Sequence, residues 1–156
     1  MVEIGEPAPT SVVWKTNPNA DPEREFDMTS LLNKDAVVLY FFPGAFTGVC
    51  TKSTCDLRDQ FKDFSELNAE LYGISVDLPF SQYEFMKQND LNYPLLSDFN
   101  KELIRKYGVE DNSFVGFKGV AKRSLFLIKS GKVAYKWIAE VPSDYPPFDQ
   151  LKSHLS

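Results

Sequence analysis

The sequence predicts an α/β fold in which a central mixed β-sheet is flanked by helices. Residues 36–42 (AVVLYFF) and 70–77 (ELYGISVD) are continuous apolar runs, as expected for strands buried on both faces of a sheet. A segment of helical period lies between these runs, so this part reads as strand, helix, strand. Residues 123–138 then form two strands around a Ser130-Gly131 turn, which is typical of an antiparallel hairpin. This order indicates a thioredoxin-like α/β sandwich.

The flanking elements are predicted from apolar spacing and from residues that start or stop helices. The first 35 or so residues would form an N-terminal extension with a strand at 12–14 and a short turn near Ser30. The expected helices run from about 47–50 to 67, from 81 to 89, from an N-cap at Asn100 to just before Gly108, and from 147 to 155.

Length and composition indicate one domain, residues 1–156, with no linker or repeat to divide it. The formal net charge is -5, the pI is about 4.9, and the 17 Lys and Arg residues are scattered along the chain. Such a surface should repel nucleic acid and anionic lipid. No apolar run approaches the ~18 residues that a membrane span requires. We therefore expect neither a nucleic-acid partner nor a membrane.

The chain contains two cysteines, Cys50 and Cys55, and one histidine, His154. The N-terminal residues lack the layout of a secretory signal, so we expect a cytoplasmic, reducing location, where static disulfides are rare. A closed zinc site usually needs four Cys or His ligands. The residues therefore disfavour both a structural disulfide and a metal site.

Cys50 is predicted to lie on the buried side of the first turn of a helix. Leu57, Phe61 and Phe64 form one apolar stripe, and Cys50 lies seven residues before Leu57 on that stripe. Unpaired backbone N–H groups and the positive end of the helix dipole favour an anion at this position. We therefore expect the thiolate form of Cys50 to be stabilised.

Cys55 is predicted to lie on a different side of the same helix. At five residues beyond Cys50 it is rotated by roughly 140° and displaced by about 7.5 Å along the axis. Its neighbours on that side are Asp59 and Lys62. Because disulfide-bonded Cα atoms normally lie within ~7 Å of each other, a Cys50–Cys55 bond would require the first turns to unwind.

The residues alone leave more than one interpretation of these thiols. A cysteine on a buried stripe is usually only a small apolar side chain. Cys55 is harder to explain in this way, because an exposed free thiol is a liability unless it has a use. Pro43 and Thr47, placed before Cys50, would surround the sulfur with a hydroxyl and N–H donors. The spacing is not C-x-x-C, which disfavours an ordinary thioredoxin-type dithiol.

The segment FFPGAFTGVC resembles the active-site motif of peroxiredoxins, Pro-x-x-x-Thr-x-x-Cys, at Pro43, Thr47 and Cys50. The second cysteine five residues on, followed by DLRD, resembles the Q or bacterioferritin-comigratory type, in which the resolving cysteine lies in the same helix. The resemblance extends over roughly residues 5–140, through PLLSD, KYGV and the segment opened by Arg123. Members of this type often carry Glu where this chain has Ser53, and an acidic turn residue where it has Lys129, which we interpret as a surface change.

The resemblance implies a thiol peroxidase that reduces hydrogen peroxide and organic hydroperoxides. Cys50 would be the peroxidatic cysteine, which attacks the peroxide and becomes a sulfenic acid. Arg123 would stabilise the thiolate and the charge that develops as the O–O bond breaks. Thr47 would hold the peroxide, and Pro43 would shield the sulfur from water. Cys55 would be the resolving cysteine that forms the disulfide after local unfolding.

The resemblance further implies that an external dithiol protein such as thioredoxin reduces the disulfide. It implies no metal and no organic cofactor, and we expect a monomer or a weak homodimer. Two other classes remain open for the same cysteine pair, namely a disulfide oxidoreductase that acts on proteins and a non-enzymatic redox sensor. Phe42 and Phe46 flank the Pro-Gly turn and are expected in the core, with the lining of an apolar entrance as the alternative.

Overall fold

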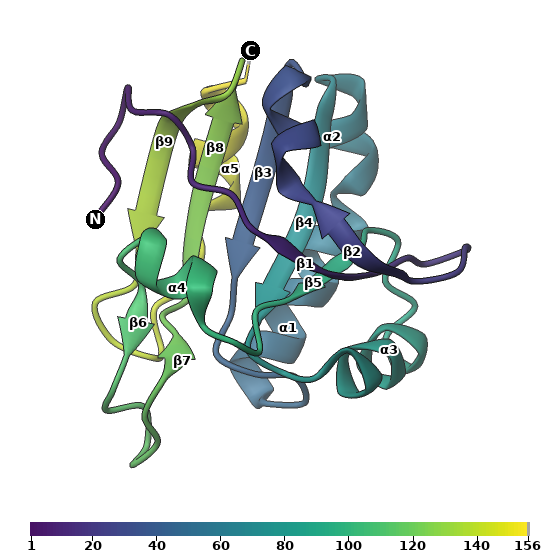
Figure 1. The fold of residues 1–156 in the computed structure, drawn as a ribbon, viewed down its shortest axis with the longest axis vertical. Helices are drawn as coiled ribbons and strands as arrows, with labels where there is room; N and C mark the ends of the chain where they lie inside the picture. The colour runs from purple at the N-terminus through teal and green to yellow at the C-terminus, as the bar shows by residue number, and fades with distance from the viewer. Residues whose placement is uncertain (156) are drawn as a thin grey trace.

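The computed structural model describes residues 1–155 and contains one main β-sheet (Figure 1). The order of its seven strands is β2-β1-β5-β4-β3-β8-β9, and β6 and β7 form a separate small ribbon. The strands are β1 (Val12–Thr16), β2 (Glu23–Asp27), β3 (Ala36–Phe41), β4 (Ala69–Ser75), β5 (Leu95–Ser97), β6 (Glu110–Asp111), β7 (Val120–Ala121), β8 (Ser124–Lys129) and β9 (Lys132–Ile138).

The sheet is mixed, which confirms the predicted fold class. Strand β3 runs parallel to β4 and antiparallel to β8, while β8 and β9 form the predicted hairpin. The N-terminal extension is itself a hairpin, since β1 pairs antiparallel with β2 and then with β5 at the sheet edge. The arrangement is thioredoxin-like, with β3 central and buried throughout because both of its faces are covered.

Helices cover both faces of the sheet. Each face of the sheet forms one apolar cluster with the helices that cover it. Helices α1, α2, α3 and α5 contribute to one cluster, and α4 and the 3₁₀ helix η1 contribute to the other. Figure 1 shows α4 in front of the sheet and α5 behind it. The helices are η1 (Met28–Asn33), α1 (Gly48–Asp59), α2 (Phe61–Glu66), α3 (Pro79–Gln88), α4 (Glu102–Lys106) and α5 (Phe148–Ser153).

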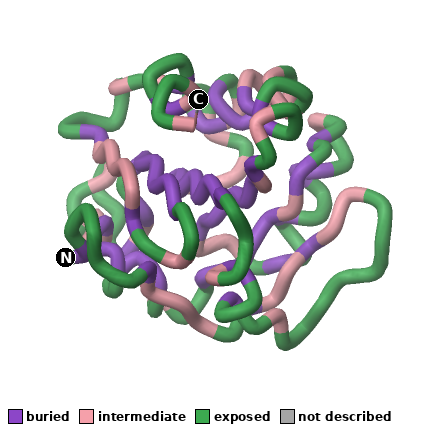
Figure 2. The backbone as a smooth tube through the Cα atoms, turned by 90° about the horizontal axis from the view of Figure 1, so that it is seen from above, coloured by how far each residue is buried: buried purple, intermediate pink, exposed green. Residues whose placement is uncertain are grey.

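Successive β3 side chains point to opposite faces, as the period of a strand requires. Val37, Leu39 and Phe41 pack with α4, whereas Val38 and Tyr40 pack with α1. Figure 2 shows that buried backbone is concentrated in the middle of the molecule and exposed backbone around it. Tyr40 therefore reaches from the central strand toward the helix that carries both cysteines.

The structure corrects two of the predicted helix boundaries. The helix expected to run continuously to residue 67 is interrupted at Gln60, which ends α1 and precedes α2. Asn100 is not the N-cap of α4; Lys101 occupies that position with a φ of 62°. The capping hydrogen bonds come instead from Asp98, whose carboxylate accepts from Leu103 N at 3.0 Å and Ile104 N at 2.9 Å. The side chain of Asp98, two residues before the expected N-cap Asn100, therefore caps α4 in its place.

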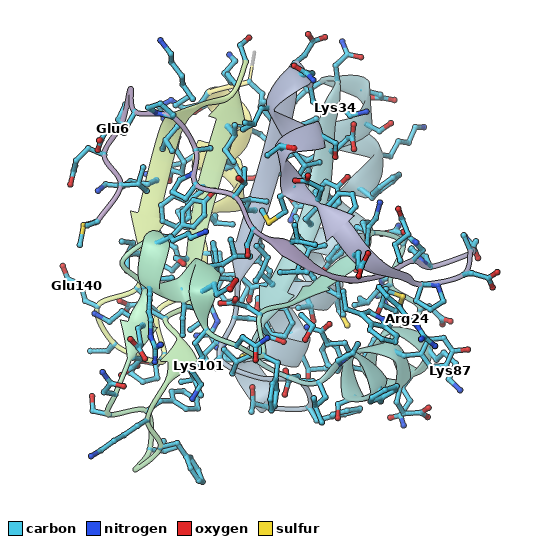
Figure 3. All side chains as sticks on the ribbon, in the orientation of Figure 1. Glu6, Arg24, Lys34, Lys87, Lys101 and Glu140 are labelled. Atoms are coloured by element: carbon cyan, nitrogen blue, oxygen red, sulfur yellow. The ribbon has the colours of Figure 1, made fainter. Side chains whose placement is uncertain are left out.

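Most charged side chains lie on the outside, as Glu6, Lys87 and Glu140 illustrate near the outline of the molecule in Figure 3. Within residues 1–155, the charged side chains that are buried belong to Asp98 and Arg123. Asp98 is accounted for by its bonds to α4, although burial raises the pKa of its carboxyl group. No described helix is long and apolar enough to cross a membrane. The buried guanidinium of Arg123 is the remaining charge to be explained.

Candidate active site

A six-residue loop, 42–47, joins the carboxyl end of β3 to α1. Asp77, just beyond β4, holds this loop, because its carboxylate accepts from Ala45 N at 2.8 Å and from Ser75 Oγ at 2.7 Å. The contact follows from the parallel pairing of β3 and β4, which brings their carboxyl ends to the same edge of the sheet. Asp77 was not expected from the sequence, although an acidic residue at the end of a buried apolar run was an available signal.

Phe46 is not in the core, contrary to expectation. Its side chain is 52% exposed, and its ring contacts Phe85 edge-on with centroids 5.2 Å apart. The loop turns the backbone of Phe46 to a φ of 67°, which aims the residue away from the interior. Phe42, at the end of β3, is fully buried as predicted.

Cys50 lies in the first turn of α1, and its side chain is fully buried. The first backbone bond of the helix runs from Thr51 N to Thr47 O at 2.8 Å. The amides of residues 48–50 therefore have no partner within the helix and point toward its N-terminal end. An anion near this end is favoured by these N–H groups and by the helix dipole.

Thr47 occupies the N-cap position without capping the helix through its side chain. Its hydroxyl donates instead to Gly44 O, at 3.1 Å. The single proton is thus directed into the loop, and the hydroxyl oxygen keeps lone pairs that can accept from another group. This leaves Thr47 able to bind a donor that enters beside the helix terminus.

Arg123 precedes β8, which is adjacent to β3, and only 2% of its surface is exposed. Its Nη2 donates to Cys50 Sγ at 3.0 Å, and its Nη1 donates to Pro142 O at 2.5 Å. Burial alone would lower the pKa of Arg123, but the neighbouring Tyr40 and Cys50 outweigh it, and the pKa is raised. The guanidinium therefore stays charged beside the sulfur.

Two adjoining surface pockets reach Arg123, the exposed-side member of this pair. One, of about 180 Å³, is lined by Pro43, Arg123, Phe114 and Pro142 among others. The second, of about 280 Å³, shares the last three of these residues and adds Thr47. The structure thus brings together Pro43, Thr47, Cys50 and Arg123, four of the five site residues expected from the sequence.

Cys55, the fifth expected residue, lies apart from this group. Its side chain is half-buried, and its sulfur contacts Asn89 Oδ1, at 3.5 Å, at the end of α3. Arg58 of α1 also bonds to Asn89, since its Nη1 donates to Asn89 O at 2.5 Å. Both cysteines are free thiols on an unbroken α1. The predicted placement of the two thiols on different sides of one helix is confirmed.

A buried polar pair beneath Cys50 was also missed from the sequence. The Tyr40 hydroxyl forms a hydrogen bond with Ser53 Oγ, and both side chains are fully buried. Burial raises the pKa of Tyr40 far above its ordinary value, and Cys50 adds to this effect. The phenol therefore stays neutral. One sequence signal existed, namely a tyrosine in an otherwise apolar strand.

Among residues 1–155, no cluster of three or more His, Cys, Asp or Glu side chains is arranged to hold a metal ion.

Comparison with known proteins assigns the family. Residues 4–136 match the family model described as AhpC/TSA family. The chain belongs to the AhpC/TSA family. A putative peroxiredoxin of Mycobacterium tuberculosis is 36% identical over 105 residues, covering 67% of this chain and 68% of the relative. This confirms the resemblance to peroxiredoxins carried by Pro43, Thr47 and Cys50.

Two further comparisons concern chain length and fold. The 2-Cys peroxiredoxin BAS1 of spinach chloroplasts is 32% identical over 142 residues, which cover 81% of this chain but 52% of the relative. The chain thus spans about half the length of that relative. The crystal structure of the peroxidoxin BcpB of M. tuberculosis has a TM-score of 0.81 at 28% identity, covering 99% of this chain and 97% of the other.

Proposed function

We propose that the protein is a thiol-dependent peroxidase that reduces hydrogen peroxide and organic hydroperoxides, with Cys50 as its peroxidatic residue. The observation that carries this proposal is the 3.0 Å contact between Arg123 Nη2 and Cys50 Sγ at the N-terminal end of α1. A buried guanidinium on a sulfur favours the thiolate, which is the nucleophilic form. Membership of the AhpC/TSA family supports the same chemistry.

In the first step the Cys50 thiolate attacks the nearer oxygen of the hydroperoxide. A sulfur–oxygen bond forms, the O–O bond breaks, and the leaving oxygen takes a proton to depart as water or an alcohol. Arg123 stabilises the negative charge that develops on the oxygens. Thr47 accepts a hydrogen bond from the hydroperoxide proton, and Pro43 restricts the access of water. Cys50 is left as a sulfenic acid.

In the second step the Cys55 thiolate attacks the Cys50 sulfur, so that an S–S bond forms and the sulfenic oxygen leaves as water. The first turns of α1 must unwind before this attack, because the intact helix holds the two thiols on different sides. An external dithiol protein such as thioredoxin then supplies two electrons and two protons through thiol–disulfide exchange. This exchange leaves the reductant as a disulfide and returns Cys50 and Cys55 to thiols.

The entrance favours small and apolar hydroperoxides. The pocket beside Thr47 is lined mainly by carbon, with Val49, Phe114 and Val115 at its walls. Apolar walls shelter an alkyl group, while Arg123 at the bottom binds the polar O–O group. This supports activity toward organic hydroperoxides as well as toward hydrogen peroxide.

Peroxide consumption by reduced protein, with a dithiol-protein reductase supplied, tests the proposal. Wild type should consume peroxide catalytically, and Cys50→Ser should consume none above the uncatalysed rate. The matched control is Thr51→Ser, an adjacent helical residue, which should behave as wild type. Mass spectrometry of the peroxide-treated protein should show an intramolecular Cys50–Cys55 disulfide. Equal consumption by Cys50→Ser and wild type would refute the proposal.

The alternative of a disulfide oxidoreductase is weakened by the burial of Cys50. Its side chain is fully buried, and the pockets that reach the neighbouring Arg123 have volumes of about 180 and 280 Å³, which suit a small hydroperoxide and not the disulfide of a folded protein. A redox sensor that does not turn over is separated from the peroxidase by the same assay, because it would consume peroxide only once.

The remaining features of the proposal concern subtype, partners and location. The cysteine spacing and the likeness to BcpB support the Q type. We also propose that the protein acts as a monomer or weak homodimer, and that it works in a reducing compartment such as the cytoplasm, where Cys50 and Cys55 would be returned to thiols.

A further inference from the structure

Two asparagines in the segment between α3 and β5 bond to the second half of α1. The side-chain oxygen Oδ1 of Asn89 accepts from the Cys55 thiol at 3.5 Å, and its main-chain oxygen accepts from Arg58 Nη1 at 2.5 Å. Asn92 Nδ2 donates in the opposite direction, to Arg58 O at 3.1 Å. These three bonds, which we call the anchor, join α1 to the end of α3 at Cys55 and at Arg58.

The end of α3 gives the anchor a fixed base. Asp90 has a φ of 48°, the left-handed conformation that ends many helices, and Leu91 N donates back to Met86 O at 3.1 Å, as in a Schellman motif. The last carbonyl groups of a helix have no partner within it. The carbonyl of Asn89 is one of these groups, and the guanidinium of Arg58 supplies the missing donor.

The Asn89 amide is oriented by its own helix. Phe85 O can only accept, so the amide atom that lies 2.9 Å from it is the donor Nδ2. Oδ1 is therefore directed toward Cys55 and accepts the proton of its thiol. Cys55 is thus held at the end of α3, away from Cys50.

A second fixed point lies before α1. The carboxylate of Asp77 accepts from Ala45 N at 2.8 Å and holds the loop that precedes the helix. Residues 46–54, which include Cys50, lie between this bond and the anchor. A helix rises about 1.5 Å per residue and an extended strand about 3.3 Å, so unwinding of this segment supplies the chain length that Cys50 needs to move around the helix.

Oxidation loosens the first turn of α1 and leaves the anchor unchanged. The bond of 3.0 Å from Arg123 to Cys50 and the unpaired helix amides both favour a negatively charged sulfur. This attraction is lost when the sulfur becomes a neutral sulfenic acid. The anchor bonds do not involve Cys50 and therefore persist.

We propose that Asn89, Asn92 and Arg58 are positioning residues that keep the second half of α1 wound, so that Cys50 travels to a stationary Cys55. The Cys55 sulfur attacks the Cys50 sulfur, an S–S bond forms, and the S–O bond breaks. The thiol proton leaves with the sulfenic hydroxyl group as water. The inference rests on the proposed function for the sulfenic acid, whereas the place at which α1 unwinds in the disulfide form can be tested without it.

Hydrogen exchange measured by NMR spectroscopy shows which half of α1 unwinds. The disulfide is made with diamide, which takes up the two thiol hydrogens, and mass spectrometry verifies that it is intramolecular. The amides of Ser53 and Thr54 should exchange at least about tenfold faster in the disulfide form than in the reduced form. The amides of Asp59 and Gln60 should change by less than about twofold. A tenfold rise at Asp59 and Gln60 as well would overturn the proposal.

Asn89→Ala removes the side-chain part of the anchor. Gln88→Ala is the matched control, because Gln88 is the preceding residue and bonds to Glu84 on the surface. In the disulfide form, Asn89→Ala should speed exchange at Asp59 and Gln60 about fivefold, the size expected for one lost hydrogen bond, and Gln88→Ala should not. Equal exchange in the two variants would overturn the proposal.

Two checks separate a local anchor from general stability. The amide of Leu39, in β3, should exchange at the wild-type rate in Asn89→Ala, and a fivefold rise there would mean that the whole fold is weakened, which would overturn the proposal. If Asn89→Ala does not fold, as judged by circular dichroism, Arg58→Ala replaces it, because this change removes the donor to Asn89 O. Arg58→Ala should also speed exchange at Gln60, and an unchanged rate would overturn the proposal.

The rate of disulfide formation after peroxide gives an independent check. A bond that breaks before this step restrains it, whereas a bond kept throughout does not. Tyr93→Phe removes a bond to Thr54 O, in the unwinding half, and should speed the step about fivefold. The same gain in Asn89→Ala would overturn the proposal. Failure of the wild type to react with peroxide would refute the proposed function, yet the exchange rates would still decide the role of the anchor.

Discussion

The first turn and the middle of α1 give their thiols different surroundings. Cys50 is fully buried and contacts a buried guanidinium, while Cys55, five residues on, is half-buried and contacts the neutral amide of Asn89. One sulfur lies beside unpaired helix amides, and the other lies in the middle of the helix, where those groups are already bonded. The comparison teaches that helix position and a single cation suffice to give two identical side chains different chemical surroundings.

Removal of Cys55 gives the largest expected change in turnover. Cys55→Ser should react with one equivalent of peroxide at the wild-type rate and then stop, because serine cannot displace the sulfenic oxygen. Dimedone should trap the product as a Cys50 adduct detectable by mass spectrometry. Continued turnover of this variant with a dithiol-protein reductase would show that the two thiols are not divided in this way.

Removal of the cation at Cys50 should slow the first step alone. Arg123→Gln should reduce the rate constant for peroxide by about 100-fold, the usual cost of losing a preorganised donor. Arg105→Gln is the control, because Arg105 is exposed and pairs with Glu110 on the surface. Stopped-flow measurement of peroxide consumption distinguishes them. A rate equal to that of Arg105→Gln would mean that the contact with Cys50 is only structural.

Loosening α1 should instead accelerate the second step. Tyr93→Phe removes the hydrogen bond to Thr54 O in the turn just before Cys55, and the loss of about 1 kcal/mol of helix restraint should speed disulfide formation roughly fivefold. The first step should change by less than about twofold. Quenched-flow mass spectrometry resolves the two steps. Slower disulfide formation in this variant would mean that α1 does not need to unwind.

The smallest effect concerns stability at alkaline pH. Burial raises the pKa of Tyr40, so the folded protein keeps a proton that the unfolded chain loses above about pH 10. The free energy of unfolding should therefore fall as pH rises above 10, by up to about 1.4 kcal/mol per pH unit from this residue. Tyr40→Phe should reduce that slope in urea unfolding measured from pH 9 to 11. The exposed position Tyr83→Phe is the control.

The positions of Cys50, Cys55 and Arg123 were predictable from the sequence, because helix geometry and the chemistry of the side chains determine them. The place of Cys50 in the first turn followed from its spacing to Leu57, and the separation of Cys55 followed from helix geometry. Arg123 was found through the family resemblance, and the burial cost of a guanidinium at the start of an apolar strand pointed in the same direction.

The supporting contacts were not predictable in the same way. The hydrogen bond between Tyr40 and Ser53 depends on which face of β3 meets α1 and on the rotation of that helix. The bond from Ala45 N to Asp77 depends on the pairing of two strands far apart in the sequence. Both are properties of tertiary packing that no local pattern encodes. The break at Gln60 was missed for a similar reason, since apolar spacing continues across it to Phe64.

Two buried tyrosines, Tyr40 and Tyr93, bond to consecutive residues of α1, Ser53 and Thr54. On the proposed function, unwinding would break both bonds, and a buried polar group left unpaired costs about 1–3 kcal/mol. The unwound helix would then be rarer than the wound one by a factor of about 30 to 10⁴. Each catalytic cycle would include a waiting time in which Cys50 persists as a sulfenic acid. During that time a second peroxide could oxidise it irreversibly. The hydrogen bonds that hold α1 to β3 and to the segment before β5 would therefore set how much peroxide the protein survives.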